Sequence, residues 1–197
     1  MQKACEVAGK EPIFRILPYQ KKKAGIVTTG SEVYYHRIED KFTPVVIEKL
    51  KECGVTEVKQ IQCNDDHEMI TEAIQTLIED GSDLIVCTGG MSVDPDDKTP
   101  LAIKNACTEV VTYGAPVLPG AMFMLAYCEK EGRQIPVMGL PGCVMYAKRT
   151  IFDLVLPRIM CDEKLHEKDF RLLGQGGLCL SCPVCTFPNC GFGKGGY

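Results

Sequence analysis

Short apolar runs alternate with stretches of helical periodicity along most of the chain. The runs, each long enough for a strand, cover residues 25–29, 58–63, 84–87, 110–112 and 136–140. Apolar residues recur at helical spacing in residues 40–53, 66–79, 99–107, 121–130 and 146–160. Helices of this length between strands are typical of βαβ crossovers, which make the strands parallel. The pattern predicts an α/β fold with a mostly parallel sheet.

Ligands of such a sheet bind outside the carboxyl ends of the strands, so the loops after the strands carry the candidate chemistry. The loop after residues 84–87 is the richest of them. Gly89 and Gly90 let backbone N–H groups approach an anion, and Asp94, Asp96 and Asp97 supply carboxylates suited to magnesium. This loop predicts a site that handles phosphate groups.

Three further strand ends carry small, hydroxyl or acidic residues. They are Thr28-Thr29-Gly30-Ser31-Glu32, Asn64-Asp65-Asp66 and Pro141-Gly142-Cys143. Each has an ordinary explanation when it is taken alone, because the first could be a turn and Asp65 or Asp66 could cap a helix. Their occurrence at successive strand ends favours a shared ligand site.

Composition narrows the function classes. The chain has 197 residues, a net charge of −4 and 45% apolar residues, which fits one domain with a proper core plus appendages. The acidic balance argues against a binder of nucleic acid or membrane surfaces. No apolar stretch reaches the roughly 18 residues of a membrane span, and no signal-peptide pattern opens the chain. We therefore expect a cytoplasmic protein.

Three segments are expected. Residues 1–22 read as a remnant of a preceding segment, since an apolar run at residues 13–17 ends at Pro18 without a domain of its own. Residues 23–162 form the α/β domain, and residues 163–197 form a cysteine-rich tail. The abrupt start leads to the hypothesis that the chain is a piece of a longer protein.

The twelve cysteines fall into two groups. Those scattered through the chain are expected to be reduced, apolar fillers: Cys5, Cys53, Cys63, Cys87, Cys107, Cys128, Cys143 and Cys161. The others crowd into the tail with the spacing C-x2-C-x2-C-x4-C: Cys179, Cys182, Cys185 and Cys190. Four thiolates at this density favour a zinc ion or an iron–sulfur cluster, although neither standard spacing fits fully. A tail of free thiols is the alternative.

Several motifs together resemble the molybdopterin-binding domain family. They are Thr28-Thr29-Gly30-Ser31-Glu32, Asp40, Asp65, Thr88-Gly89-Gly90-Met91-Ser92, Asp97-x-Thr99-Pro100, Pro119-Gly120 and Gly139-Leu140-Pro141-Gly142. That family includes MogA-type molybdopterin adenylyltransferases, MoeA-type molybdenum insertases and the amino-terminal domain of CinA proteins. The resemblance covers about residues 23–160. It implies a three-layer α/β/α fold with a doubly wound sheet.

The resemblance also implies roles for individual residues. Asp65 and Asp97 match the essential aspartates of the adenylyltransferases, which would act through Mg²⁺ and the phosphates of ATP and molybdopterin. The residues implied to bind the cofactor are Thr28, Thr29, Gly30, Ser31, Glu32, Asp40, Thr88, Gly89, Gly90, Met91, Ser92, Pro141 and Gly142. Domains of this family form dimers or trimers, and the apolar residues on several sides of the last predicted helix are in keeping with an oligomer.

Two departures separate this chain from the family pattern. Cys143 and Val144 stand where insertases carry Asn and Pro, and His36 stands where a glycine is usual. Adenylyltransferases, for their part, lack a cysteine tail. Three functions therefore remain open: an enzyme that adenylates molybdopterin or inserts molybdate, a non-catalytic carrier of the cofactor, and a CinA-like nucleotide pyrophosphatase.

Overall fold

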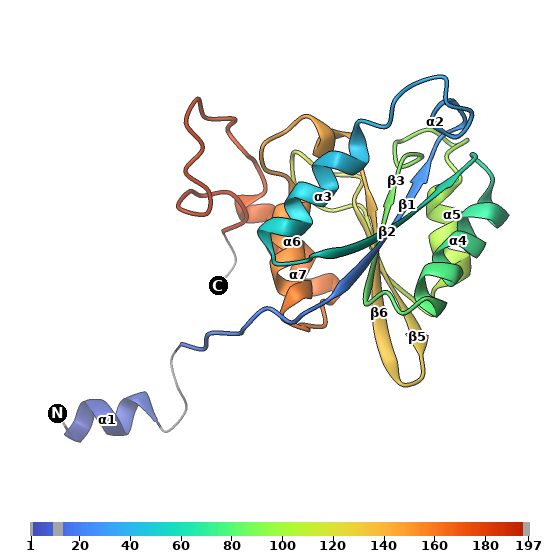
Figure 1. Cartoon of the computed structure of the whole chain (residues 1–197). Coiled ribbons are helices and arrows are strands. Elements are labelled where there is room, and N and C mark those ends of the chain that lie inside the picture. Colours follow the sequence, from blue (N-terminus) through green and yellow to red (C-terminus); the bar gives the residue numbers. More distant parts are fainter. Residues whose placement is uncertain (1, 10–13, 195–197) are drawn as a thin grey trace.

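A six-stranded sheet lies at the centre of the computed structural model, which describes residues 2–9 and 14–194 (Figure 1). The strands are β1 (Lys23–Thr29), β2 (Glu57–Cys63), β3 (Leu84–Thr88), β4 (Glu109–Tyr113), β5 (Met124–Lys130) and β6 (Arg133–Leu140). Their order in the sheet is β2-β1-β3-β6-β5-β4. Neighbours pair in parallel except at β5, which runs antiparallel to β4 and β6. The expected mostly parallel, doubly wound sheet is confirmed.

Helices cover both faces of the sheet. The helices of the described residues are α1 (Gln2–Ala8), α2 (Ser31–Tyr34), α3 (Phe42–Glu52), α4 (His67–Glu79), α5 (Thr99–Ala106), α6 (Ile151–Met160) and α7 (Glu167–Leu172), with short 3₁₀ turns η1 (Gly142–Met145) and η2 (Leu173–Gly176). Helix α1 lies away from the sheet (Figure 1). Figure 1 shows α3 and α6 on one face and α4 and α5 on the other. The three-layer α/β/α arrangement is confirmed.

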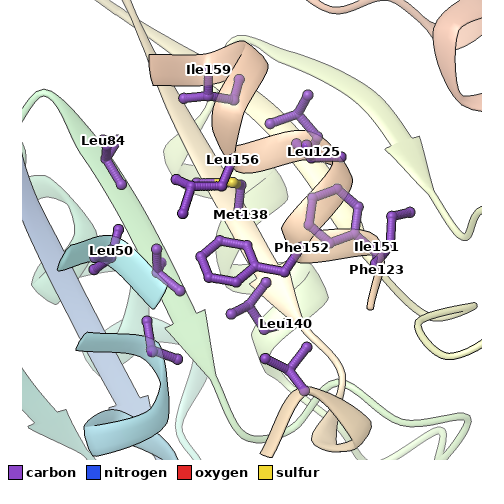
Figure 2. Packing of buried hydrophobic residues seen from close by; sticks show 14 of the residues in the cluster. Leu50, Leu84, Phe123, Leu125, Met138, Leu140, Ile151, Phe152, Leu156 and Ile159 are labelled. Atoms are coloured by element: carbon purple, nitrogen blue, oxygen red, sulfur yellow. The ribbon is translucent and has the colours of Figure 1, made fainter. Parts of the chain in front are cut away.

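Strand β3 shows why the layers form. Leu84 and Val86 belong to the apolar cluster under α3 and α6, whereas Ile85 and Cys87 belong to the cluster under α4 and α5. A strand buried on both faces needs a continuous apolar run, which is what its sequence provides. Figure 2 shows Leu84 within the first cluster, together with Leu50 from α3 and Phe152 from α6.

The helix expected at residues 121–130 is wrong, because this segment contains strand β5. The strand is central and buried on both faces, so its apolar run does not alternate and cannot be distinguished from a helix by periodicity. The signal that would have identified it is Glu131-Gly132. Both residues have positive φ, 52° and 74°, and they form the two-residue hairpin turn between β5 and β6.

The last predicted helix is shorter than expected. Thr150 caps α6 by accepting a hydrogen bond from the N–H of Phe152, so the helix begins at Ile151. Its apolar residues are largely buried within the chain itself, and Leu154 contacts the tail at Gly193. The expected oligomer is therefore not supported by an apolar surface on this helix.

Both ends of the chain include residues outside the described ranges. Ile13 of the expected apolar run and residues 195–197 lie outside the described residues. The segment before β1 joins the domain where the N–H of Gln20 donates to the carbonyl of Met160 at 2.8 Å. Among the helices of the described ranges, none is long and apolar enough to span a bilayer.

Candidate functional site

Asp65 lies just after β2 and holds Ser31, which follows the neighbouring strand β1. Its Oδ2 accepts hydrogen bonds from the backbone N–H of Ser31 at 2.8 Å and from the Ser31 hydroxyl at 2.9 Å. The hydroxyl also lies 2.6 Å from Oδ1 of Asn64. Capping of helix α4 is the ordinary explanation for Asp65 and Asp66. The residue that caps it is Asp66, which accepts hydrogen bonds from the N–H groups of Glu68 and Met69. Asp65 is thus left to order the loop after β1.

Asp97 holds Ser92 in the same way on the loop after β3. Its Oδ2 accepts from the backbone N–H of Ser92 at 2.6 Å and from the hydroxyl at 2.8 Å. The acidic residues of this loop do not converge, since Asp94 instead accepts from the N–H of Asp96 within the turn. Of the three acids, Asp97 is the one whose carboxylate contacts Ser92.

Gly89 packs the loop after β3 against the end of β1, and Gly90 packs the same loop against the start of α5. A Cβ at Gly89 would lie 2.4 Å from the carbonyl oxygen of Thr29, and one at Gly90 would lie 2.8 Å from Oγ1 of Thr99. The Thr99 hydroxyl in turn donates to the carbonyl of Gly89 at 2.9 Å. These close approaches bring the two serine–aspartate pairs onto adjoining loops at one edge of the sheet.

A pocket of about 590 Å³ opens beside Ser92. Its lining residues are Met91, Ser92, Val93, Leu118, Pro119, Gly120, Ala121, Met122, Pro141, Gly142, Cys143, Leu178 and Cys179. The predicted residues Met91, Ser92, Pro141 and Gly142 meet here, and the volume is typical of small-molecule pockets. The walls are mainly apolar, so the pocket suits a flat ring system with a polar group directed to Ser92.

Two tail residues of this pocket are not among the residues that the sequence predicts for cofactor binding. Leu178 and Cys179 come from the tail, which reaches the site because the Leu118 N–H donates to the Gly177 carbonyl at 2.6 Å. The Cys179 N–H returns a hydrogen bond to the Leu118 carbonyl at 2.8 Å. No local pattern could have identified a contact between residues so far apart in the sequence.

Two residues implied to bind the cofactor, Thr28 and Asp40, belong to a polar network that joins buried Thr28 and Thr43 to half-buried Asp40 and exposed Gln60. The Thr28 hydroxyl lies 2.8 Å from the Thr43 hydroxyl, and the Gln60 amide donates to Oγ1 of Thr28 and to Oδ2 of Asp40, both at 2.9 Å. Asp40 Oδ1 also accepts from the N–H groups of Phe42 and Thr43 at the start of α3. Their observed contacts anchor α3 against β1 and β2.

The environment of Asp40 alters its acidity. Burial raises the pKa of this carboxyl, but the hydrogen bonds from Thr43, Phe42 and Gln60 act in the opposite direction and leave the pKa below its usual value. The carboxylate form is therefore favoured in the folded protein.

Four other residues that the resemblance implies for cofactor binding lie on or beside β1 and β3: Thr29, Gly30, Glu32 and Thr88. Thr88 is fully buried, and its hydroxyl has no hydrogen-bond partner within the described part of the chain. Gly30 precedes α2 with a φ of 132°, and Glu32 is exposed on that short helix. Thr29 lies 3.3 Å, hydroxyl to hydroxyl, from Thr99 beneath the loop after β3.

Tyr113 at the end of β4 is a further neighbour of the site that the sequence did not identify. Its hydroxyl lies 3.5 Å from the carbonyl oxygen of Ser92. Burial, and after it the negative charge of Asp97, raise the pKa of Tyr113. Tyr113 therefore keeps its proton and offers a neutral donor beside the Asp97 loop.

The four tail cysteines line a separate cavity of about 370 Å³. Cys179 and Cys190 are half-buried, whereas Cys182 and Cys185 are exposed. Across the described residues, no three His, Cys, Asp or Glu side chains are grouped closely enough to hold a metal ion as they stand.

Comparison with known proteins identifies the domain type. The family model described as "Probable molybdopterin binding domain" matches residues 25–160. A CinA-like protein of Mycobacterium sp. (strain MCS) is 35% identical over 85 residues, which is 43% of this chain and 20% of that protein. A CinA-like protein of Mycobacterium avium (strain 104) is 34% identical over 95 residues, 48% of this chain and 22% of that protein. The chain thus spans about a fifth of the length of these curated relatives.

Solved structures agree on the fold. The tungsten cofactor synthesizing protein MoaB from Pyrococcus furiosus superposes with a TM-score of 0.54 at 22% identity, covering 64% of this chain and 84% of that one. A molybdopterin biosynthesis protein from Mycobacterium abscessus gives a TM-score of 0.56 at 18% identity, covering 71% and 92%. At these identities the likeness concerns the fold alone.

Proposed function

The chain belongs to the molybdopterin-binding domain family, and on that premise we propose that it adenylates molybdopterin during assembly of the molybdenum cofactor. The observation that supports this most is the pair of serines, Ser31 and Ser92, each held by an aspartate through both its N–H and its hydroxyl. These hydrogen bonds engage both donors of each serine and hold the two carboxylates at neighbouring strand ends, where carboxylates suit a Mg²⁺ ion that binds phosphate oxygens.

The pterin ring is proposed to occupy the pocket of about 590 Å³ beside Ser92. Its apolar walls would contact the ring, and the phosphate of molybdopterin would be directed to the Ser92 loop. ATP would place its phosphates toward the Ser31 loop, because the close packing of Gly89 on Thr29 keeps the two loops adjacent.

The reaction joins two anions. An oxygen of the pterin phosphate attacks the α-phosphorus of ATP, the bond to the β-phosphate breaks, and pyrophosphate leaves with that electron pair. No proton transfer is required, so the protein's task is positioning and neutralisation of charge. The serine hydrogen bonds use Oδ2 of Asp65 and of Asp97, which leaves one oxygen of each carboxylate outside them. These oxygens would bind Mg²⁺, whose charge offsets that of the phosphates.

We favour adenylation over molybdate insertion because Cys143 and Val144 replace the Asn-Pro pair of the insertases. The test is incubation of purified protein with molybdopterin and Mg-ATP, with and without molybdate. Formation of adenylated pterin and pyrophosphate is the expected result. Molybdate-dependent loss of a supplied adenylate would assign insertion instead, and tight pterin binding without turnover would assign a carrier.

The CinA-like relatives provide a second candidate, a nucleotide pyrophosphatase, in which the same loops would bind a dinucleotide phosphate. Release of AMP from ADP-ribose in the absence of pterin separates this activity from adenylation. The free cysteines suit a reducing compartment such as the cytoplasm for either activity.

A further inference from the structure

The C-terminal segment forms a loop with fixed ends. The N–H of Gly193 donates to the carbonyl of Gly176 at 2.6 Å, which closes residues 177–192, here called the tail loop. A Cβ at Gly176 would lie 2.5 Å from the backbone N and O of Lys194, and one at Gly193 would lie 2.4 Å from Leu154. Both positions therefore require glycine. Because the two ends of the loop are already together, binding of a ligand by the loop would not have to meet the entropy cost of closing it.

The tail loop is also attached to the domain near its two ends. Gly177 and Cys179 exchange backbone hydrogen bonds with Leu118, and a Cβ at Gly177 would lie 2.1 Å from the carbonyl oxygen of Pro116. Phe192, 4% exposed, belongs to the core cluster under α6. The parts that carry Cys179 and Cys190 therefore have defined positions, and both cysteines pack against that cluster.

The part of the tail loop that carries Cys182 and Cys185, residues 180–185, has little to hold it. Leu180 and Val184 are each 77% exposed, and apolar contact with the core cluster resumes at Phe187. An exposed segment without apolar burial needs another source of stability, such as a bound metal. Cys182 and Cys185 lie in this exposed part.

All four tail cysteines nevertheless line the same cavity of about 370 Å³. Lys148 and Arg149 line it as well, so cationic groups adjoin the thiols. Arg149 also pairs with Glu52 and Asp153 and lies over the Phe187 ring, 5.1 Å from its centroid, which places the tail loop against α3 and α6.

We propose that Cys179, Cys182, Cys185 and Cys190 bind one thiophilic metal centre, a zinc ion or an iron–sulfur cluster, which draws the exposed part of the tail loop onto the domain. Cys179 and Cys190 provide the fixed half of the site. Cys182 and Cys185 complete it by moving inward, because the described side chains are not grouped for a metal without such a movement. For zinc, four thiols lose four protons, and the ion with four thiolates carries a charge of −2 in a cavity that Lys148 also lines.

This centre would border the proposed pterin pocket, because Cys179 lines both cavities. The metal proposal does not depend on adenylation. Its test measures metal and thiol protection, so it can succeed or fail whatever the pterin assay gives.

The experiment uses the full chain purified without oxygen. Metal analysis is expected to find about one zinc per chain, or iron together with acid-labile sulfide, and the two results distinguish the two centres. The variant with Ser at positions 179, 182, 185 and 190 is expected to lose that metal. The matched control Cys161→Ser changes a thiol outside the tail loop and is expected to keep it.

Alkylation of thiols provides a second measurement. The tryptic peptide of residues 172–194 contains the four tail cysteines, and residues 159–164 contain Cys161 alone. Metal should protect the first peptide from N-ethylmaleimide while Cys161 reacts as before, and a chelator should abolish the protection. If added zinc, or iron with sulfide, neither binds nor protects this peptide, or if the fourfold variant keeps the metal while folded by circular dichroism, the proposal is overturned.

Discussion

Asp97 accepts hydrogen bonds from both the backbone N–H and the hydroxyl of Ser92, at 2.6 and 2.8 Å. The carboxylate of one residue thus fixes both donors of the other. Asp65 and Ser31 repeat this relationship on the loop after the neighbouring strand. Two carboxylates held in fixed orientations at one edge of the sheet give the proposed Mg²⁺ and phosphate chemistry its physical basis.

Replacing Asp97 by Asn should separate positioning from charge. The amide keeps the size of the side chain but removes the negative charge needed for Mg²⁺, so adenylation should fall by about 100-fold or more while pterin binding falls less. Ser92→Ala keeps the N–H and loses the hydroxyl, so its loss should be nearer to 10-fold. Turnover of AMP-pterin is measured for both.

Asp80→Asn provides the control for loss of a carboxylate. Asp80 ends α4 and pairs with Lys59 at 3.1 Å, away from the strand ends that form the site. Its turnover should equal that of the unaltered protein. If Asp97→Asn is as active as Asp80→Asn, the carboxylate of Asp97 has no role in turnover.

Gly89→Ala should destabilise the protein far more than Gly81→Ala. Both glycines have similar positive φ, 88° and 86°, so both substitutions incur a similar backbone cost of about 1 kcal/mol. An alanine Cβ has open space at Gly81, whereas at Gly89 it would lie 2.4 Å from the Thr29 carbonyl oxygen. Urea unfolding should show a further loss of about 2 kcal/mol for Gly89→Ala. Equal losses would mean that the two loops do not pack as described.

Thr88→Val should stabilise the protein. The Thr88 hydroxyl is buried without a partner among the described residues, and a methyl group of similar size removes that unsatisfied group. The free energy of unfolding should rise by about 1 kcal/mol. Thr150→Val is the contrasting variant, because the Thr150 hydroxyl accepts from the N–H of Phe152 at the start of α6. That variant should lose about 1 kcal/mol or more in the same titration. A loss in Thr88→Val would indicate that its hydroxyl has a partner.

The success and failure of the sequence predictions have physical causes. Helix α4 was predicted well because its apolar face, its cap at Asp66 and its stop at Gly81 are all local signals. Strand β5 was mistaken for a helix because burial on both faces erases the alternation that identifies a strand.

The candidate site was only partly predictable. The rule for parallel sheets correctly brought Asp65, Ser31 and the Asp97 loop to one edge. Thr28 and Thr88 are the last core-facing positions of their strands, following Ile26 and Val86 on the same face, so strand alternation could have directed both hydroxyls inward. The contribution of Cys179 depends on a long-range contact with Leu118, for which the sequence holds no local signal.

Because of Asp40, the free energy of unfolding should decrease as the pH falls. Its pKa in the folded protein lies below the ordinary value of about 3.9, which the unfolded chain retains. The folded state therefore gains stability from this carboxylate above the ordinary pKa, and the gain disappears as pH falls through the folded pKa. Asp40→Asn keeps an oxygen to accept from Phe42 and Thr43 but cannot ionise. The difference in unfolding free energy between the two proteins should be largest near neutral pH and shrink toward about pH 3. A difference that stays constant across this range would show that Asp40 stabilises α3 without its charge.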